Sequence, residues 1–102
     1  MVIELDLESK FNELIKEGLV LVDFNATWCG PCRMLKPEIE ALSEERKDVK
    51  FVSVDVDNFN ALSARYNVRV VPTLVLFKDG KVIEVTTGYR PKESLNNFLS
   101  NR

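Results

Sequence analysis

The hydrophobic residues of the chain switch repeatedly between the spacing of strands and the spacing of helices. The run at residues 19–24 is apolar almost throughout, which is typical of a strand covered on both faces. Asp79-Gly80 joins two further apolar runs and is a strong hairpin signal. Together the β-prone segments predict five strands, at residues 2–5, 19–24, 49–56, 74–78 and 81–87.

Four helices are predicted between and after these strands. Asp6 is placed to cap the first, and Gly18 suits the left-handed residue that closes it. The second begins near Pro31, and its buried side is expected to hold Met34, Leu35, Ile39 and Leu42. A short helix follows residues 57–58, and the last helix begins at Pro91.

The resulting element order is βαβαβαββα. Alternating strands and helices in the first half imply parallel strands joined by right-handed crossovers. The hairpin adds antiparallel pairing, so the expected fold class is α/β, with one central mixed five-stranded sheet flanked by four helices. A chain of 102 residues is large enough for one core and too small for two, so residues 1–102 are expected to form a single domain.

Composition narrows the possible partners. A net charge of −2 without any basic cluster gives no reason to expect nucleic acid or an anionic membrane surface. The first residues lack the pattern of a signal peptide, and no apolar run approaches the length of a membrane span. We therefore expect no membrane association and a cytoplasmic location. A monomer is expected, because no large apolar face is left over once the core is assigned.

Both cysteines lie in one stretch, Trp28-Cys29-Gly30-Pro31-Cys32, at the turn from a strand into a helix. The free N–H groups and the dipole of the helix start favour a thiolate on Cys29. Cys32 is expected to lie deeper, which makes it the natural resolving thiol. Gly30-Pro31 keeps the turn short and stiff. Because stable structural disulfides are unusual in the cytoplasm, this spacing predicts a redox-active dithiol.

Three other interpretations of the cysteine pair are weaker. A purely structural disulfide between Cys29 and Cys32 would close a very small loop and would stabilise the fold by only about 2 kcal/mol. As a zinc site, it lacks ligands, because the chain has no histidine and no third cysteine. As two buried core residues, the cysteines would need neither Gly-Pro nor a helix start. We therefore expect no metal.

Three segments resemble the thioredoxin family, in order and in spacing: DFNATWCGPC at 23–32, Val-Pro-Thr at 71–73 and Phe-Lys-Asp-Gly at 77–80. The resemblance covers nearly the whole chain and implies the thioredoxin fold. It also implies a protein-disulfide reductase that acts by dithiol–disulfide exchange and is recycled by an NADPH-dependent thioredoxin reductase. Such a protein binds no cofactor of its own. Its partners are that reductase and client proteins with disulfides.

The resemblance gives catalytic roles to three residues. Cys29 matches the family's nucleophile, Cys32 its resolving cysteine, and Asp23 a buried carboxylate that accepts the Cys32 proton. Desolvation agrees with the last role, because burial should raise the pKa of Asp23 toward the neutral range. The alternative is that Asp23 is a structural aspartate held by hydrogen bonds.

The resemblance also outlines a groove for the client peptide. Pro72 matches a proline whose preceding peptide bond is cis, which would present the Val71 backbone to an extended client. Gly88 would allow the two backbones to approach closely. Asp57 matches a residue that hydrogen-bonds the Trp28 indole, although both could be ordinary turn-packing residues. With Asp57 in support, the implied substrate-binding set is Trp28, Gly30, Pro31, Val71, Pro72 and Gly88.

Two alternatives to a reductase stay open. A disulfide oxidase or isomerase uses the same chemistry, but Gly30-Pro31 is the reducing-type dipeptide of the family, where isomerases tend to carry a histidine. A non-catalytic docking subunit is the second alternative, since a fold by itself does not imply a function. Such a subunit would not need the two cysteines, Asp23 and Pro72 together.

Two residues depart from the common family pattern. Asn25 stands where many bacterial thioredoxins have a tryptophan, and Ser53 stands where a lysine often neighbours the buried aspartate. Without that cation, we expect the pKa of Asp23 to be raised further.

Overall fold

A computed structural model describes residues 1–100 of the chain. Its centre is a five-stranded sheet with the strand order β1-β3-β2-β4-β5. The strands β1, β3 and β2 run parallel, whereas β4 is antiparallel to both β2 and β5. The predicted mixed sheet is therefore confirmed, and its strands are β1 (Val2–Glu4), β2 (Leu19–Asn25), β3 (Val49–Asp55), β4 (Thr73–Lys78) and β5 (Lys81–Thr87).

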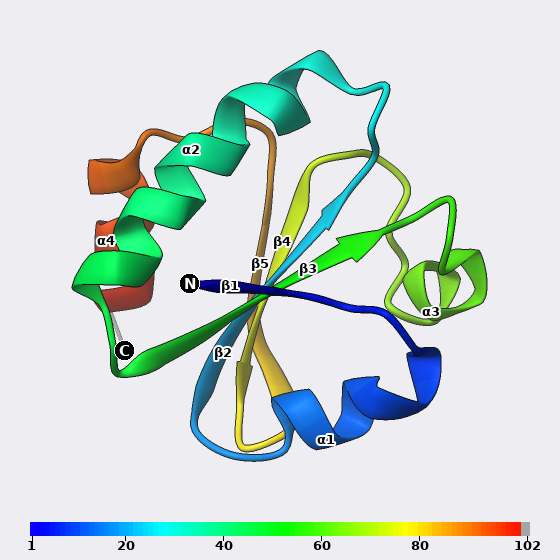
Figure 1. The fold of residues 1–102 in the computed structure, drawn as a ribbon. Helices are drawn as coiled ribbons and strands as arrows, with labels where there is room; N and C mark the ends of the chain where they lie inside the picture. Colours follow the sequence, from blue (N-terminus) through cyan, green and yellow to red (C-terminus); the bar gives the residue numbers. More distant parts are fainter. Residues whose placement is uncertain (101–102) are drawn as a thin grey trace.

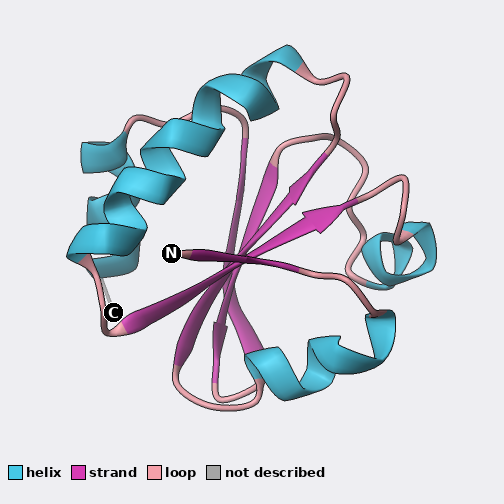
Figure 2. Ribbon diagram, in the orientation of Figure 1, coloured by secondary structure: helices cyan, strands magenta, loops and turns pink. Residues whose placement is uncertain are grey.

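Helices cover both faces of this sheet, as Figures 1 and 2 show. On one face lie α2 (Gly30–Glu45) and α4 (Lys92–Ser100). On the other lie α1 (Phe11–Ile15), preceded by the 3-10 turn η1 (Glu8–Lys10), and α3 (Asn60–Arg65). No helix within residues 1–100 is both long enough and apolar enough to cross a membrane.

The central strand β2 supplies side chains to two separate cores. Because side chains alternate along a strand, Val20, Val22 and Phe24 pack under α1 and α3. Leu21 faces the other way and packs with the apolar residues of α2 and α4. Asp23 shares the face of Leu21, so a carboxylate occupies a core position beneath α2.

The turn between β4 and β5 has the conformation that its sequence predicts. Asp79 and Gly80 both have positive φ, 50° and 85°, as a tight hairpin turn with the twist of the flanking strands requires. Gly18, with φ of 74°, lies beside it, and its N–H donates to the Asp79 carboxylate at 2.7 Å. This hydrogen bond connects the residue before β2 with the hairpin turn.

Two details of the predicted helices are wrong. Asp6 does not cap the first helix, because η1 begins after Leu7, with no side-chain cap; Asp6 instead pairs with Lys10 at 3.1 Å. Met34 is 61% exposed rather than buried. The buried stripe of α2 follows Leu35, Ile39 and Leu42, and a residue one position earlier is turned about 100° away from it.

Candidate active site around Cys29 and Cys32

The two cysteines lie where β2 leads into α2, and they form a disulfide. Cys29 is the residue that precedes the helix and has an extended backbone, with φ of −88° and ψ of 115°. Pro31 occupies the first turn, where its missing N–H costs no hydrogen bond. The change from strand to helix brings the two Cα atoms to 5.2 Å, within the range that a disulfide can bridge.

The helix start supplies a donor to the Cys29 sulfur. The Cys32 backbone N–H points at Cys29 Sγ, with an N–S distance of 3.2 Å. This N–H is one of those left unpaired at the start of a helix, and the helix dipole adds positive potential at the same end. Both effects stabilise negative charge on Cys29 when the disulfide is reduced.

The surroundings, rather than the depth, distinguish the two sulfurs. Each cysteine is 5% exposed, so the expected difference in burial is not seen. The Cys29 sulfur lies 3.6 Å from the carbonyl oxygen of Val71. Cys32 instead lines a polar cavity together with Asp23. The Cys29 sulfur therefore lies beside the loop before β4, and Cys32 is part of the wall of the cavity that also holds Asp23.

The loop before β4 contains the expected cis bond, between Val71 and Pro72. Gly88 lies beside it and donates its N–H to the Pro72 carbonyl oxygen at 2.9 Å. Gly88 has a φ of +88°, which favours glycine over any residue with a Cβ. Next to this loop is a shallow groove of about 160 Å³, lined by Trp28, Val56, Val68, Arg69, Val70 and Val71.

Asp57 holds the Trp28 side chain at the rim of that groove. The indole N–H donates to Asp57 Oδ2 at 2.8 Å, so the hydrogen bond implied by the family resemblance is present. The Asp57 backbone N–H in turn donates to Asp55 Oδ1 at 2.8 Å. Trp28 itself is 66% exposed, which leaves its ring free to contact another molecule.

Asp23 is a buried carboxylate, and its two oxygens differ in their hydrogen bonding. The residue is 7% exposed, and its Oδ1 has no hydrogen-bond partner within residues 1–100. Burial raises its pKa from the ordinary 3.8 to about 6; a hydrogen bond from Asn25 opposes the rise, and the charge of Glu4 adds to it. The carboxyl group therefore changes its charge close to neutral pH.

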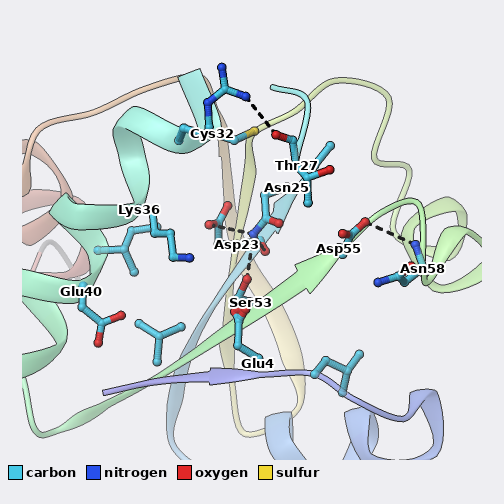
Figure 3. Close-up of a pocket in the computed structure, with 15 residues that line it drawn as sticks. Glu4, Asp23, Asn25, Thr27, Cys32, Lys36, Glu40, Ser53, Asp55 and Asn58 are labelled. Atoms are coloured by element: carbon cyan, nitrogen blue, oxygen red, sulfur yellow. Dashed lines mark hydrogen bonds between the residues drawn. The ribbon is translucent and has the colours of Figure 1, made fainter. Parts of the chain in front are cut away.

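A cavity of about 630 Å³ connects Asp23 and Cys32 with the surface (Figure 3). Its floor is a polar row across three neighbouring strands, because Glu4 pairs with Ser53 and Ser53 pairs with Asp23. Its other wall includes Cys32, Lys36 and Glu40, which share one stripe of α2 at a spacing of four residues.

Three residues of this cavity are not found by reasoning from the sequence. Glu40 is readily interpreted as part of a solvated helix face, and Glu4 and Lys36 match no motif. The four-residue spacing from Cys32 through Lys36 to Glu40 is the signal that points to Lys36 and Glu40. Glu4 has no comparable signal, because the register of β1 against β3 brings it there.

A Ser53→Lys variant tests how strongly this cavity controls Asp23. Ser53 is the β3 partner of Asp23, so an ammonium group on that side chain would lie near the carboxylate. An opposite charge favours the ionised form, and we expect the pKa of Asp23 to fall below its present value of about 6. An NMR titration of the Asp23 carboxyl carbon measures it. An unchanged or higher pKa would contradict the expectation.

The geometry defines a class of protein. A disulfide at the start of a helix, a cis-proline loop beside one sulfur and a buried carboxylate near the other are the parts of a thiol-disulfide oxidoreductase. The mixed sheet with helices on both faces that carries them is the thioredoxin fold.

The comparisons with known proteins give the family. The thioredoxin family model matches residues 2–101. The chain is 46% identical over 94 residues to thioredoxin of Listeria monocytogenes, covering 91% of each protein. It is 42% identical over 94 residues to thioredoxin of Bacillus subtilis, covering 91% of this chain and 90% of the relative. The chain therefore belongs to the thioredoxin family.

Solved structures agree with this assignment. The structure of a mutant thioredoxin from Halobacterium salinarum superposes with a TM-score of 0.89 at 37% identity, covering 96% of this chain and 87% of that one. Family and disulfide together show that the chain is a thioredoxin-type disulfide reductase with the redox-active pair Cys29–Cys32. Its partners include client proteins that contain disulfides.

Proposed function

We propose that Cys29 is the attacking thiolate and Cys32 the resolving thiol. The Cys29 thiolate attacks one sulfur of a client disulfide; that bond breaks, and the departing client thiolate takes up a proton. Cys32, once deprotonated, attacks the Cys29 sulfur, which releases the second client thiolate and leaves the Cys29–Cys32 disulfide. The observation that carries this order is the Cys32 N–H donated to Cys29 Sγ at 3.2 Å.

Asp23 is the proton acceptor for Cys32 in this proposal. Both residues line the same cavity, and Asp23 keeps one oxygen without a partner among residues 1–100. A carboxyl group with a pKa of about 6 is mostly ionised at pH 7, yet it is basic enough to take a proton from a thiol. The proton then leaves through the open side of the cavity.

The client docks as an extended peptide beside the cis-proline loop. The Val71 carbonyl oxygen lies 3.6 Å from the attacking sulfur, so a strand paired with the Val71 backbone would bring its own disulfide to Cys29. Pro72 and Gly88 hold this loop, and the exposed Trp28, oriented by Asp57, offers apolar area beside it. Gly30 and Pro31 form the rim of the site on the α2 side.

Each turnover oxidises the dithiol, so two electrons must be resupplied. We propose that a flavin-dependent thioredoxin reductase delivers them from NADPH, and that the chain itself binds no cofactor and no metal. The cysteine chemistry needs only thiolates and a proton acceptor, which supports this assignment. The same proposal places the protein in the cytoplasm as a monomer, where a reducing pool favours the dithiol.

The redox potential separates a reductase from a disulfide oxidase or isomerase. Equilibration with glutathione buffers should give a midpoint potential of about −270 mV, the value typical of thioredoxins, whereas isomerases have a potential of about −180 mV. In a coupled assay, thioredoxin reductase should oxidise NADPH only when both this protein and a disulfide substrate are present. A midpoint in the isomerase range, or no coupling to the reductase, would overturn the proposal.

A further inference from the structure

Asn25 donates a hydrogen bond to the Asp23 side chain. The two residues lie two positions apart on β2, so their side chains project from the same face of the sheet. Asn25 Nδ2 lies 3.1 Å from Asp23 Oδ2, 3.2 Å from the Asp23 backbone oxygen and 2.8 Å from Ser53 Oγ. Figure 3 shows the amide between the carboxylate and Ser53.

The chemistry of the amide fixes how these contacts are made. An Asn side chain has two N–H groups on Nδ2. One N–H donates to Ser53 Oγ. The other is shared by Asp23 Oδ2 and the Asp23 backbone oxygen. The opposite orientation would place the amide oxygen against the carboxylate, two acceptors without a proton between them. The nitrogen therefore faces Asp23 when that residue is ionised.

This arrangement makes the two carboxylate oxygens different. Oδ2 is bound by Asn25, whereas Oδ1 is buried and has no partner within the described part of the chain. A buried acceptor without a partner is costly, so it is retained only where something compensates for it. Because Oδ2 is already bound, Oδ1 is the oxygen left to accept a proton from Cys32, which lines the same cavity as Asp23.

We propose that Asn25, with its second N–H bonded to Ser53, is a positioning residue that binds Asp23 Oδ2 and keeps Oδ1 as the proton-accepting oxygen. The proposal rests on the proposed role of Asp23. It also explains how the chain tolerates Ser53 in place of a lysine. A neutral donor supplies part of the stabilisation of the carboxylate that a neighbouring cation would otherwise give.

Other charged groups face Asp23 from the elements packed against it, and they set the background for any titration. Glu4 on β1 raises the pKa of Asp23, in opposition to the Asn25 hydrogen bond. The remaining ionisable residues around the cavity come from α2 and β3, and they are Arg33, Lys36, Glu40 and Asp55. Substitution of Asn25 leaves all of them in place.

An Asn25→Ala variant tests the proposal through the titration of Asp23. Loss of a hydrogen bond to an ionised group should move the pKa of Asp23 upward by about 1, measured by NMR on its carboxyl carbon. The reduction rate at pH 6.5, divided by the rate at pH 8, should fall about threefold relative to the unmodified protein. That ratio follows the ionised fraction of Asp23, and a merely structural loss would lower both rates alike.

Asn58→Ala is the matched control. Asn58 lines the same cavity, but its side chain makes no hydrogen bond to Asp23, so the pKa should not move. Asn25→Leu provides a second test should the alanine variant fold poorly. It keeps the branch at Cγ without the N–H groups, and the same upward movement is expected. An Asp23 pKa that stays unchanged in the Asn25 variants, or moves as far in Asn58→Ala, would overturn the proposal.

Failure of this inference can be told apart from failure of the proposed function. If Asp23→Asn reduces disulfides at the unmodified rate across the pH range, Asp23 is not the proton acceptor and the proposed role is wrong. If Asp23→Asn is slow but Asn25→Ala leaves the pKa of Asp23 unchanged, only the positioning role of Asn25 is wrong.

Discussion

A Cys29→Ser protein should lose disulfide reduction by a factor on the order of a thousand or more, as expected when an enzyme loses its nucleophile. Cys29 Sγ is the sulfur that accepts the helix-start N–H and lies beside the Val71 carbonyl oxygen. A serine hydroxyl in its place would not ionise near neutral pH and could not form the mixed disulfide. The measurement is the initial rate of disulfide reduction with thioredoxin reductase and NADPH in excess.

A Cys32→Ser protein is the matched control, because it differs by the same atom at the other end of the disulfide. It should still attack a client disulfide but should not release the client. A covalent adduct through Cys29 is therefore expected, visible by mass spectrometry under non-reducing conditions and removed by a thiol reductant. Residual activity in Cys29→Ser, or an adduct that forms through Cys32, would contradict the assigned order of attack.

The order of the elements could be predicted because local signals determine it. The strand at β2 is a continuous apolar run, and Asp79-Gly80 has the positive φ angles that its sequence predicts. The helix start near Pro31 could be predicted because proline lacks an N–H that the first turn of a helix does not need. Each of these features depends on a few neighbouring residues, so no tertiary information is required.

The polar cavity could not be predicted, because it depends on register between distant segments. Glu4, Ser53 and Asp23 form one row only because β1 and β2 pair with β3 in a particular alignment. A shift of one residue in either pairing would turn one member of the row to the opposite face of the sheet. Nothing in the local sequence of Glu4 carries that information.

The cis bond before Pro72 was expected from the family resemblance and not from local chemistry. For X–Pro bonds the cis form is a minority state, so the residues Val71-Pro72 alone favour trans. Similarly, Asn25 and Ser53 are two separate departures from the family pattern in the sequence. The structure shows that they are bonded to each other and that both belong to the surroundings of Asp23.

Burial of the Asp23 carboxylate has opposite effects on stability and on function. Burial raises the pKa of Asp23 into the range useful for accepting a thiol proton, and the same burial makes its ionised form costly for folding. Oδ1, which has no hydrogen-bond partner in the described part of the chain, shows the same conflict, since a hydrogen bond to it would stabilise the fold but occupy the accepting oxygen. Removal of the charge should therefore change stability and turnover in opposite directions.

We expect Asp23→Asn to raise the free energy of unfolding of the oxidised protein at pH 7 by about 3 kcal/mol, from a pKa of about 6 in the folded state and 3.8 in the unfolded state. The sign follows from the raised pKa. Below pH 3.8 both states are protonated and the charge costs nothing, whereas above pH 6 both are ionised and only the folded state buries the charge. The gain should therefore be complete above pH 6 and disappear as the pH falls toward 3.8.

Denaturant unfolding of the oxidised Asp23→Asn protein between pH 3.5 and 8 measures this gain. Asp48→Asn is the control, because the exposed Asp48 has its pKa lowered by a hydrogen bond from Arg46 and should give no gain at pH 7. The same Asp23→Asn protein should reduce disulfides on the order of ten- to a hundredfold more slowly at pH 7, since it has lost its proton acceptor. A variant that is less stable at pH 7, or a stability gain that persists unchanged at pH 3.5, would show that burial of the Asp23 charge is not what opposes folding.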